Sequence, residues 1–94
     1  MIRSFKNAAT EAAFRGEQSR DIPFRVVKVA RRKLGMVDAA KELDDLRSPP
    51  GNKLHKLSGD RKGQYAIRIN DQYRVCFNWT DGDAYDVEVT DYHS

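Results

Sequence analysis

Apolar and polar residues alternate along residues 59–79, and the prediction for the rest of the chain starts from this stretch. A period of two is typical of β-strands, and the polar break at residues 70–72 predicts that the two runs form a β-hairpin. One side of an antiparallel sheet usually faces water, so the face that carries Arg68 and Arg74 is the candidate functional surface. The apolar side chains on the other face are Tyr65, Ile67, Ile69, Tyr73, Val75, Phe77 and Trp79.

The register of this hairpin follows from which residues share a face. If the apolar residues share the buried face, the sequence positions of any two directly paired residues must add up to an even number. A three-residue loop over 70–72 meets this condition, and it pairs Ile69 with Tyr73 and Arg68 with Arg74. Two opposed arginines repel each other. Either nearby carboxylates or an anionic ligand can compensate that repulsion, and the register favours neither. The candidate carboxylates are Asp86, Glu88 and Asp91.

A second hairpin is predicted to turn at residues 80–84. Its inward residues are expected to be Tyr85, Val87 and Val89, because they continue the period of two. The same parity pairs Trp79 with Tyr85 and Arg74 with Thr90. This register brings residues 91–93 beside Arg74, so the end of the chain joins the candidate surface.

Helical periodicity dominates the first half of the chain. After a short alternation at 2–5 that suits a first strand, a helix is expected over 7–15, ended by Gly16. Ser19 and Asp21 before Pro23 are typical of a helix start. The longest helix is expected over 24–40, weakened at Gly35, where a kink or an early end is possible. Its apolar stripe is Val27, Ala30, Leu34 and Val37.

Between this helix and the hairpins the chain changes period. Residues 40–47 predict one or two more helical turns with Leu43 and Leu46 inward, and the prolines at 49 and 50 must end them. Residues 53–57 predict a strand, and 58–63 a glycine-flanked loop. The loop lacks the spacing of a phosphate-binding P-loop. The pattern as a whole indicates an α+β fold.

Length, charge and cysteine content narrow the class of protein. Residues 1–94 suffice for one domain with a single core. Residues 1–36 carry a net charge of +6 and residues 47–80 carry +5, while the last fourteen carry −5. Basic blocks of this kind fit a polyanionic partner or a solvated surface. With one cysteine, no apolar leader and no span of about 20 apolar residues, we expect a cytoplasmic protein away from membranes.

The polar side chains that can gather on the candidate surface define its possible chemistry. Two histidines and one cysteine show no metal-ligand spacing, so we expect neither a metal nor another cofactor. Histidine can transfer protons at neutral pH, and arginine can hold phosphate oxygens. Together they suit cleavage of RNA through its own 2′-hydroxyl, which DNA lacks. The gathered set is His55, Lys56, Arg61, Arg68, Arg74, Asp91, Tyr92 and His93.

Each of these residues also has an ordinary explanation. His55 can be a half-exposed sheet residue, and His93 a frayed tail position. Lys56 and Arg61 can be solubilising surface residues, and Tyr92 can pack on the sheet edge. From the residues alone, the inference therefore ends at a basic α+β domain with an affinity for RNA.

The stretch GDRKGQYAIRINDQYRVCFNW resembles the HigB toxins, a branch of the RelE/ParE toxin superfamily. The similarity extends to MIRSF at the start, NKLHKL before the loop and GDAYDVEVTDYH at the end, so it covers nearly the whole chain. The resemblance implies a RelE-like fold of two to three helices packed on a mainly antiparallel sheet of four to five strands. It also implies a metal-independent mRNA endonuclease that acts in the ribosomal A site and arrests translation.

The resemblance further implies partners and roles. The partner is a HigA-like helix-turn-helix antitoxin, through which the complex binds operator DNA. His55, His93 and Asp91 correspond to proton-transfer positions of the family, Arg74 to phosphate stabilisation and Tyr92 to substrate stacking. The charge argument adds Lys56, Arg61 and Arg68 as RNA contacts.

One position departs from the family. Some members carry a lysine three residues after the strand histidine, where this chain has Ser58. Lys56 is a candidate for that charge, although it would point to the other face of a regular strand. Two alternative functions stay open at this point: a ParE-like poison of DNA gyrase, and a non-catalytic domain that binds RNA or the ribosome.

Overall fold

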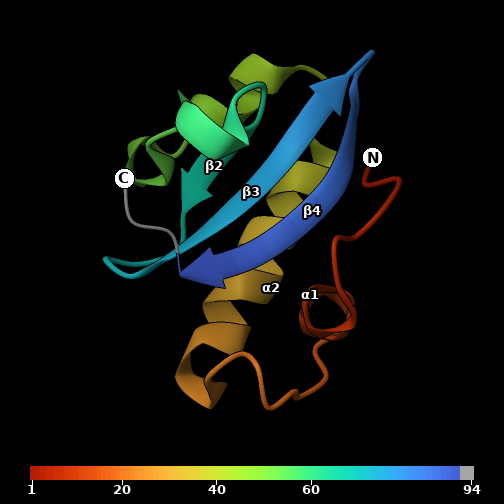
Figure 1. Ribbon diagram of the computed structural model, residues 1–94, viewed down its shortest axis with the longest axis vertical. Helices are drawn as coiled ribbons and strands as arrows, with labels where there is room; N and C mark the ends of the chain where they lie inside the picture. The colour runs from red at the N-terminus through yellow and green to blue at the C-terminus, as the bar shows by residue number, and fades with distance from the viewer. Residues whose placement is uncertain (92–94) are drawn as a thin grey trace.

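The computed structural model describes residues 1–91, and in it two helices pack on one face of a four-stranded antiparallel sheet. In Figure 1, the long helix α2 (Phe24–Ala39) passes behind β3 and β4, and α1 (Ala8–Phe14) lies beside it. This arrangement confirms the predicted α+β architecture. The strands, in the order in which they lie across the sheet, are β1 (His55–Lys56), β2 (Tyr65–Arg68), β3 (Tyr73–Thr80) and β4 (Asp83–Asp91).

The hairpin of β2 and β3 has the predicted register. Arg68 pairs with Arg74 and Ile67 with Val75, and the amide of Ile69 donates to the carbonyl of Tyr73 at 3.0 Å. Asn70 closes the turn, because its side-chain oxygen accepts from the amides of Gln72 and Tyr73. Parity therefore sufficed to place both arginines on the face away from the helices.

The second hairpin differs from the prediction. Its turn is shorter, since Thr80 pairs directly with Asp83, and the two turn residues between them have positive φ. A β-bulge then lies between the pairs of Cys76 and Asn78, where Asp86 adopts φ 51°. The shorter turn and the bulge shift the register by one residue each, in opposite directions. Beyond the bulge Arg74 therefore pairs with Thr90, as predicted, and Cys76 pairs with Glu88.

Between the turn and the bulge, every residue of β4 points to the sheet face opposite to the one predicted. Trp79 pairs with Ala84, not with Tyr85, so the predicted Trp79–Tyr85 pair is wrong. Ala84 is fully buried, and Tyr85 is 38% exposed although it was expected inward. The pattern was misleading because a single extra residue in a strand reverses the sides of all residues beyond it.

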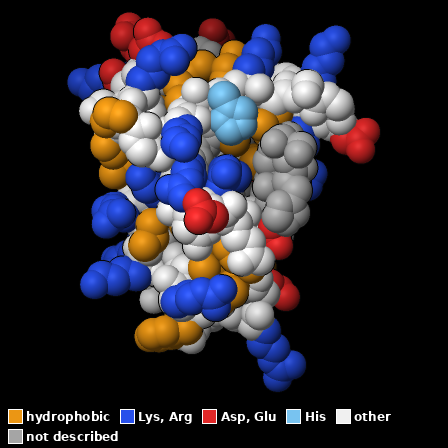
Figure 2. Space-filling model, turned by 90° about the vertical axis from the view of Figure 1, so that its left-hand side faces the viewer, with side chains coloured by type: hydrophobic (Ala, Val, Ile, Leu, Met, Phe, Trp, Pro, Cys, Tyr) orange, Lys and Arg blue, Asp and Glu red, His pale blue; other side chains and the backbone are white. Residues whose placement is uncertain are grey.

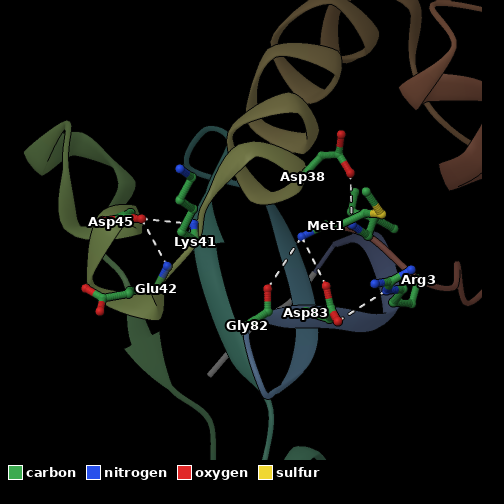
Figure 3. Close-up of polar contacts among 9 residues, drawn as sticks. Met1, Arg3, Asp38, Lys41, Glu42, Asp45, Gly82 and Asp83 are labelled. Carbon is green, nitrogen blue, oxygen red and sulfur yellow. Dashed lines mark hydrogen bonds and ion pairs between the residues drawn. The ribbon is translucent and has the colours of Figure 1, made fainter.

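The N-terminal segment runs along the outer edge of β4. Ile2 and Phe5 form parallel bridges to Ala84 and Val87, so the expected first strand is present only as isolated bridges. Figure 3 shows how polar contacts hold this segment: the Ile2 amide donates to the Asp38 carboxylate, and Asp83 pairs with the terminal amine and Arg3. Although desolvation raises the pKa of Asp83, its hydrogen bonds and charge interactions with these two cations produce a net lowering.

Both predicted helices form. Asn7 caps α1 by accepting from the Thr10 amide at 2.9 Å, and Gly16, with φ 77°, follows its end. α2 continues through Gly35, so neither a kink nor an early end is needed there. Pro23, with no side-chain cap, precedes its first residue. The predicted stripe is buried against the sheet: Val27, Ala30, Leu34 and Val37.

The chain between α2 and β1 is wound into short 3-10 turns, η1 (Leu43–Arg47) and η2 (Pro50–Asn52). Leu46 is buried as expected, and Leu43 is partly buried against the core. The strand predicted over 53–57 is reduced to the two residues of β1. No helix among residues 1–91 has the length and hydropathy required to cross a bilayer.

Candidate functional site

The sheet face opposite the helices carries two rows of side chains that run across the strands. The inner row joins His55, Ala66, Cys76 and Glu88 from β1 to β4, because each pairs with the next. The outer row, two residues along the strands, is Arg68, Arg74 and Thr90. Side chains two residues apart on one strand share a face, so the histidine and both arginines point to the same side of the sheet.

The two arginines of the outer row are held differently. Arg68 forms an ion pair with Asp71, whose side chain is 99% exposed, and such an exposed pair contributes about 0–1 kcal/mol. Arg74 donates through Nη1 to the carbonyls of Asn70 and Tyr73, and it has no carboxylate partner among residues 1–91. Neither Glu88 nor Asp86 pairs with these arginines within that range. Within residues 1–91, the charge of Arg68 is therefore balanced in part by Asp71, whereas no acidic side chain pairs with Arg74.

His55 lies at the exposed edge of the sheet on β1. Its Nδ1 is 2.8 Å from the carbonyl oxygen of Lys53. A carbonyl only accepts hydrogen bonds, so Nδ1 carries the proton in this contact. In the neutral ring Nε2 then has a free lone pair directed away from that contact, which is the form that a general base requires.

The middle of this face is covered, which the sequence did not predict. Leu57, Ala66 and Cys76 form a small buried cluster of their own. Burial raises the pKa of the Cys76 thiol to about 11; the charge of Glu88 adds a smaller increase, and the charges of Arg61 and Arg74 oppose it. Beside the cluster, Arg61 pairs with Glu88 at 3.0 Å, and a polar hollow of about 380 Å³ adjoins this pair. Arg61 is therefore close to the site, with its charge partly balanced.

The structure places two other candidate residues, Lys56 and Asp91, away from this group. Lys56 pairs with Tyr65, so it extends from the opposite side of β1, as expected for a regular strand. Asp91 pairs in register with Tyr73, and its carboxylate accepts from the Gln72 side chain at 2.9 Å. Tyr92 and His93 lie outside the described residues.

Lys33 is a buried cation near the site that was not among the predicted residues. It is 6% exposed, and its ammonium group donates to the side-chain oxygen of Asn52, which is fully buried. Burial lowers the pKa of Lys33, and the charges of Arg32 and Arg68 lower it further. A signal was present: Lys33 lies three residues after Ala30 and four before Val37, a position on the buried stripe of the helix.

Asn52 connects this buried cation to the segment that leads to His55. Its side-chain amide donates to the carbonyls of Leu46 at 3.2 Å and Ser48 at 3.3 Å, and its backbone amide donates to Pro49. The next residue, Lys53, adopts φ 48° and supplies the carbonyl that binds the His55 ring. The contacts of Asn52 with Lys33 and with these carbonyls thus hold the chain just before the residue that binds the histidine ring.

The histidine and many of the basic side chains lie on one side of the molecule. Figure 2 shows Lys and Arg side chains gathered over this side, around a histidine. Guanidiniums that can hold a phosphate near an imidazole that can accept a proton suit the cleavage of a phosphodiester. No group of three or more potential metal ligands occurs among residues 1–91.

Solved structures of similar shape show which fold this is. The chain superposes on a chain of the YoeB–YefM complex from Staphylococcus aureus with a TM-score of 0.61 and 20% identity, covering 100% of this chain and 99% of that one. A YafQ variant from E. coli also gives a TM-score of 0.61, with 14% identity and coverage of 97% and 93%. The fold is therefore the RelE-like fold of small toxins.

Sequence relatives identify the family within that class. The family described as the RelE-like toxin of the type II toxin-antitoxin system HigB matches residues 3–93, and the chain belongs to it. Toxin HigB-1 of Vibrio cholerae serotype O1 is 41% identical over 85 residues, which cover 89% of this chain and 90% of the relative. Endoribonuclease HigB of Proteus vulgaris is 33% identical over 93 residues, covering 99% and 100%. These matches favour neither a gyrase poison nor a non-catalytic domain.

Proposed function

We propose that this chain is an endoribonuclease that cleaves mRNA on the ribosome and so arrests translation in the cytoplasm. The observation that carries the proposal is the placement of His55 on the same sheet face as the opposed Arg68 and Arg74. The name of the Proteus vulgaris relative, Endoribonuclease HigB, supports the activity. Arg74, which has no carboxylate partner among residues 1–91, supports an anionic substrate.

The reaction proposed for this site needs no metal ion. The RNA 2′-oxygen attacks the adjacent phosphorus while the bond to the 5′-oxygen breaks, which leaves a 2′,3′-cyclic phosphate and a free 5′-hydroxyl. One proton leaves the 2′-hydroxyl and another reaches the 5′-oxygen, and we assign these transfers to His55 and His93, with Asp91 assisting. Arg74 stabilises the charge that develops on the phosphate.

The remaining candidate residues act in binding. Tyr92 stacks on a base of the substrate, because aromatic rings hold unpaired bases in RNA. Arg68 and Arg61 contact the RNA backbone from the same face as Arg74, while Lys56 contacts it from the sheet edge. These contacts should depend on salt concentration, since they neutralise phosphates.

We further propose a HigA-like helix-turn-helix antitoxin as the partner, with operator DNA bound only through the complex. Two of the solved structures of similar shape are YoeB–YefM toxin–antitoxin complexes, which supports an antitoxin partner for this chain. The antitoxin is expected to be encoded in the adjacent reading frame.

The activity is tested with purified protein, ribosomes and a defined mRNA. We expect cleavage only when the mRNA occupies the ribosome, and none when a single 2′-deoxynucleotide replaces the residue 5′ to the cleaved bond. Arg74→Ala and His55→Ala should each slow cleavage by at least 100-fold. Lys41→Ala, which removes an exposed charge after α2, is the matched control. Intact mRNA with the wild-type protein, or cleavage of the deoxy substrate, would refute the proposal.

A further inference from the structure

A hollow on the helical side of the molecule has no role in the proposed reaction. It has a volume of about 340 Å³, at the lower end of the range of ligand pockets, and lies between the chain after α1 and the first turns of α2. Its lining residues are Gly16, Gln18, Phe24, Arg25, Val27, Lys28 and Arg31.

The wall of this hollow depends on a glycine. Gly16 has φ 77°, and a Cβ atom built there would lie 2.9 Å from the guanidinium of Arg31. The guanidinium therefore packs directly on the backbone at Gly16, which places one of the cations at the rim. The hollow is thus shaped by specific contacts of the fold.

Phe24 is the most exposed large hydrophobic residue among residues 1–91, at 77%. It is the first residue of α2, where the helix holds its backbone in place. Around it, the lining residues include three cations and no acid. An exposed aromatic ring on a rigid element, surrounded by charge of one sign, is typical of an anchor at a protein interface.

We propose that this hollow, formed by the α1–α2 junction, is where the cognate antitoxin docks, through an acidic segment that carries an apolar side chain. The inference rests on the proposed function, because it assumes that this toxin has an antitoxin. The apolar side chain contacts Phe24 and Val27, and the flanking carboxylates pair with Arg25, Lys28 and Arg31. This charge complementarity favours an acidic peptide, and the apolar interior favours a side chain that enters it.

The position of the hollow determines what docking there does to the catalytic face. The helices cover one face of the sheet, whereas His55, Arg68 and Arg74 lie on the other. An antitoxin segment held at the α1–α2 junction leaves that second face uncovered by this contact. Substitutions in the hollow should therefore separate antitoxin binding from toxicity.

The test measures the affinity of purified toxin variants for the protein encoded in the adjacent reading frame, and the toxicity of each variant expressed alone. Phe24→Ser and Lys28→Glu should each weaken binding at least tenfold, with toxicity unchanged. Raising the salt concentration should weaken wild-type binding more than Lys28→Glu binding. The matched controls are Tyr85→Ser, an exposed aromatic residue on β4, and Lys41→Glu, and both should bind as the wild type does.

The other outcomes overturn the inference. Unchanged affinity of Phe24→Ser and Lys28→Glu excludes docking at the hollow, and so does a neighbouring protein that does not bind the wild-type toxin. Lost toxicity with unchanged affinity would instead assign the hollow to RNA or the ribosome. A failure of the proposed function is distinguishable, because the wild type would then leave mRNA intact while the affinities of the variants still follow the expected order.

Discussion

The contact between Lys33 and Asn52 provides the sharpest test of how this fold is stabilised. Asn52 is fully buried, and it accepts from a buried ammonium group and donates to two carbonyls. Replacing Asn52 with alanine leaves all three partners without their hydrogen bonds. Each buried neutral group left without its hydrogen bond lowers the free energy of unfolding by about 1–3 kcal/mol, and a charged group lowers it by more. Because water enters such a site in part, we expect a total loss of about 4 kcal/mol.

That loss is large relative to the stability of a small domain, which is about 5–15 kcal/mol. It is measured by urea denaturation of the wild type, Asn52→Ala, Lys33→Met and the double variant. Lys33→Met should cost less, since it removes the buried charge and leaves only the Asn52 oxygen unsatisfied. The double variant has no unpaired buried charge, so its loss of stability should be smaller than the sum of the two single losses by about 2 kcal/mol. Additive losses, or a loss below about 1 kcal/mol for Asn52→Ala, would refute the reasoning.

Two further predictions concern titration and reactivity. The pKa of Lys33 is lowered in the folded state, so the unfolded chain binds more protons in the pH range just below the ordinary lysine pKa of 10.5. The stability of the wild type should therefore rise with pH through that range. Lys33→Met should lose this rise when both proteins are unfolded in urea at a series of pH values. Burial raises the pKa of the Cys76 thiol to about 11, so little reactive thiolate is present at pH 8. The thiol should react with a disulfide reagent at that pH at least about 100-fold more slowly in the folded protein than in the unfolded one. Equal rates would contradict its burial.

Much of the fold was predictable because its signals are local. The period of two around the polar break and the requirement that one face be buried were enough to place Arg68 opposite Arg74. The stripe of α2 followed from helical spacing alone. The β4 bulge was not predictable in this way, because Asp86 adopts its positive φ in response to both neighbours of the strand: β3 and the N-terminal segment, where Ser4 accepts from its amide.

The candidate site was predictable in part for the same reason. His55 and the arginines were found because each residue type has a distinct chemistry and the register relates their positions. Lys33 and Asn52 were missed, because neither is unusual in sequence and their contact joins residues nineteen positions apart. The hollow at the α1–α2 junction became visible only in the structure, because it joins the chain after α1 to the first turns of α2.

The sequence by itself determined the elements, the central register and the kinds of side chain available for chemistry, because periodicity and residue type act over a few neighbouring positions. Only the tertiary structure decided which cations are balanced and which are not. Arg61 has Glu88, Arg68 has an exposed Asp71, and Arg74 has backbone carbonyls alone among residues 1–91. Such pairing depends on which strands and loops lie side by side, and a charge near an anion's path is useful only where the fold leaves it uncompensated.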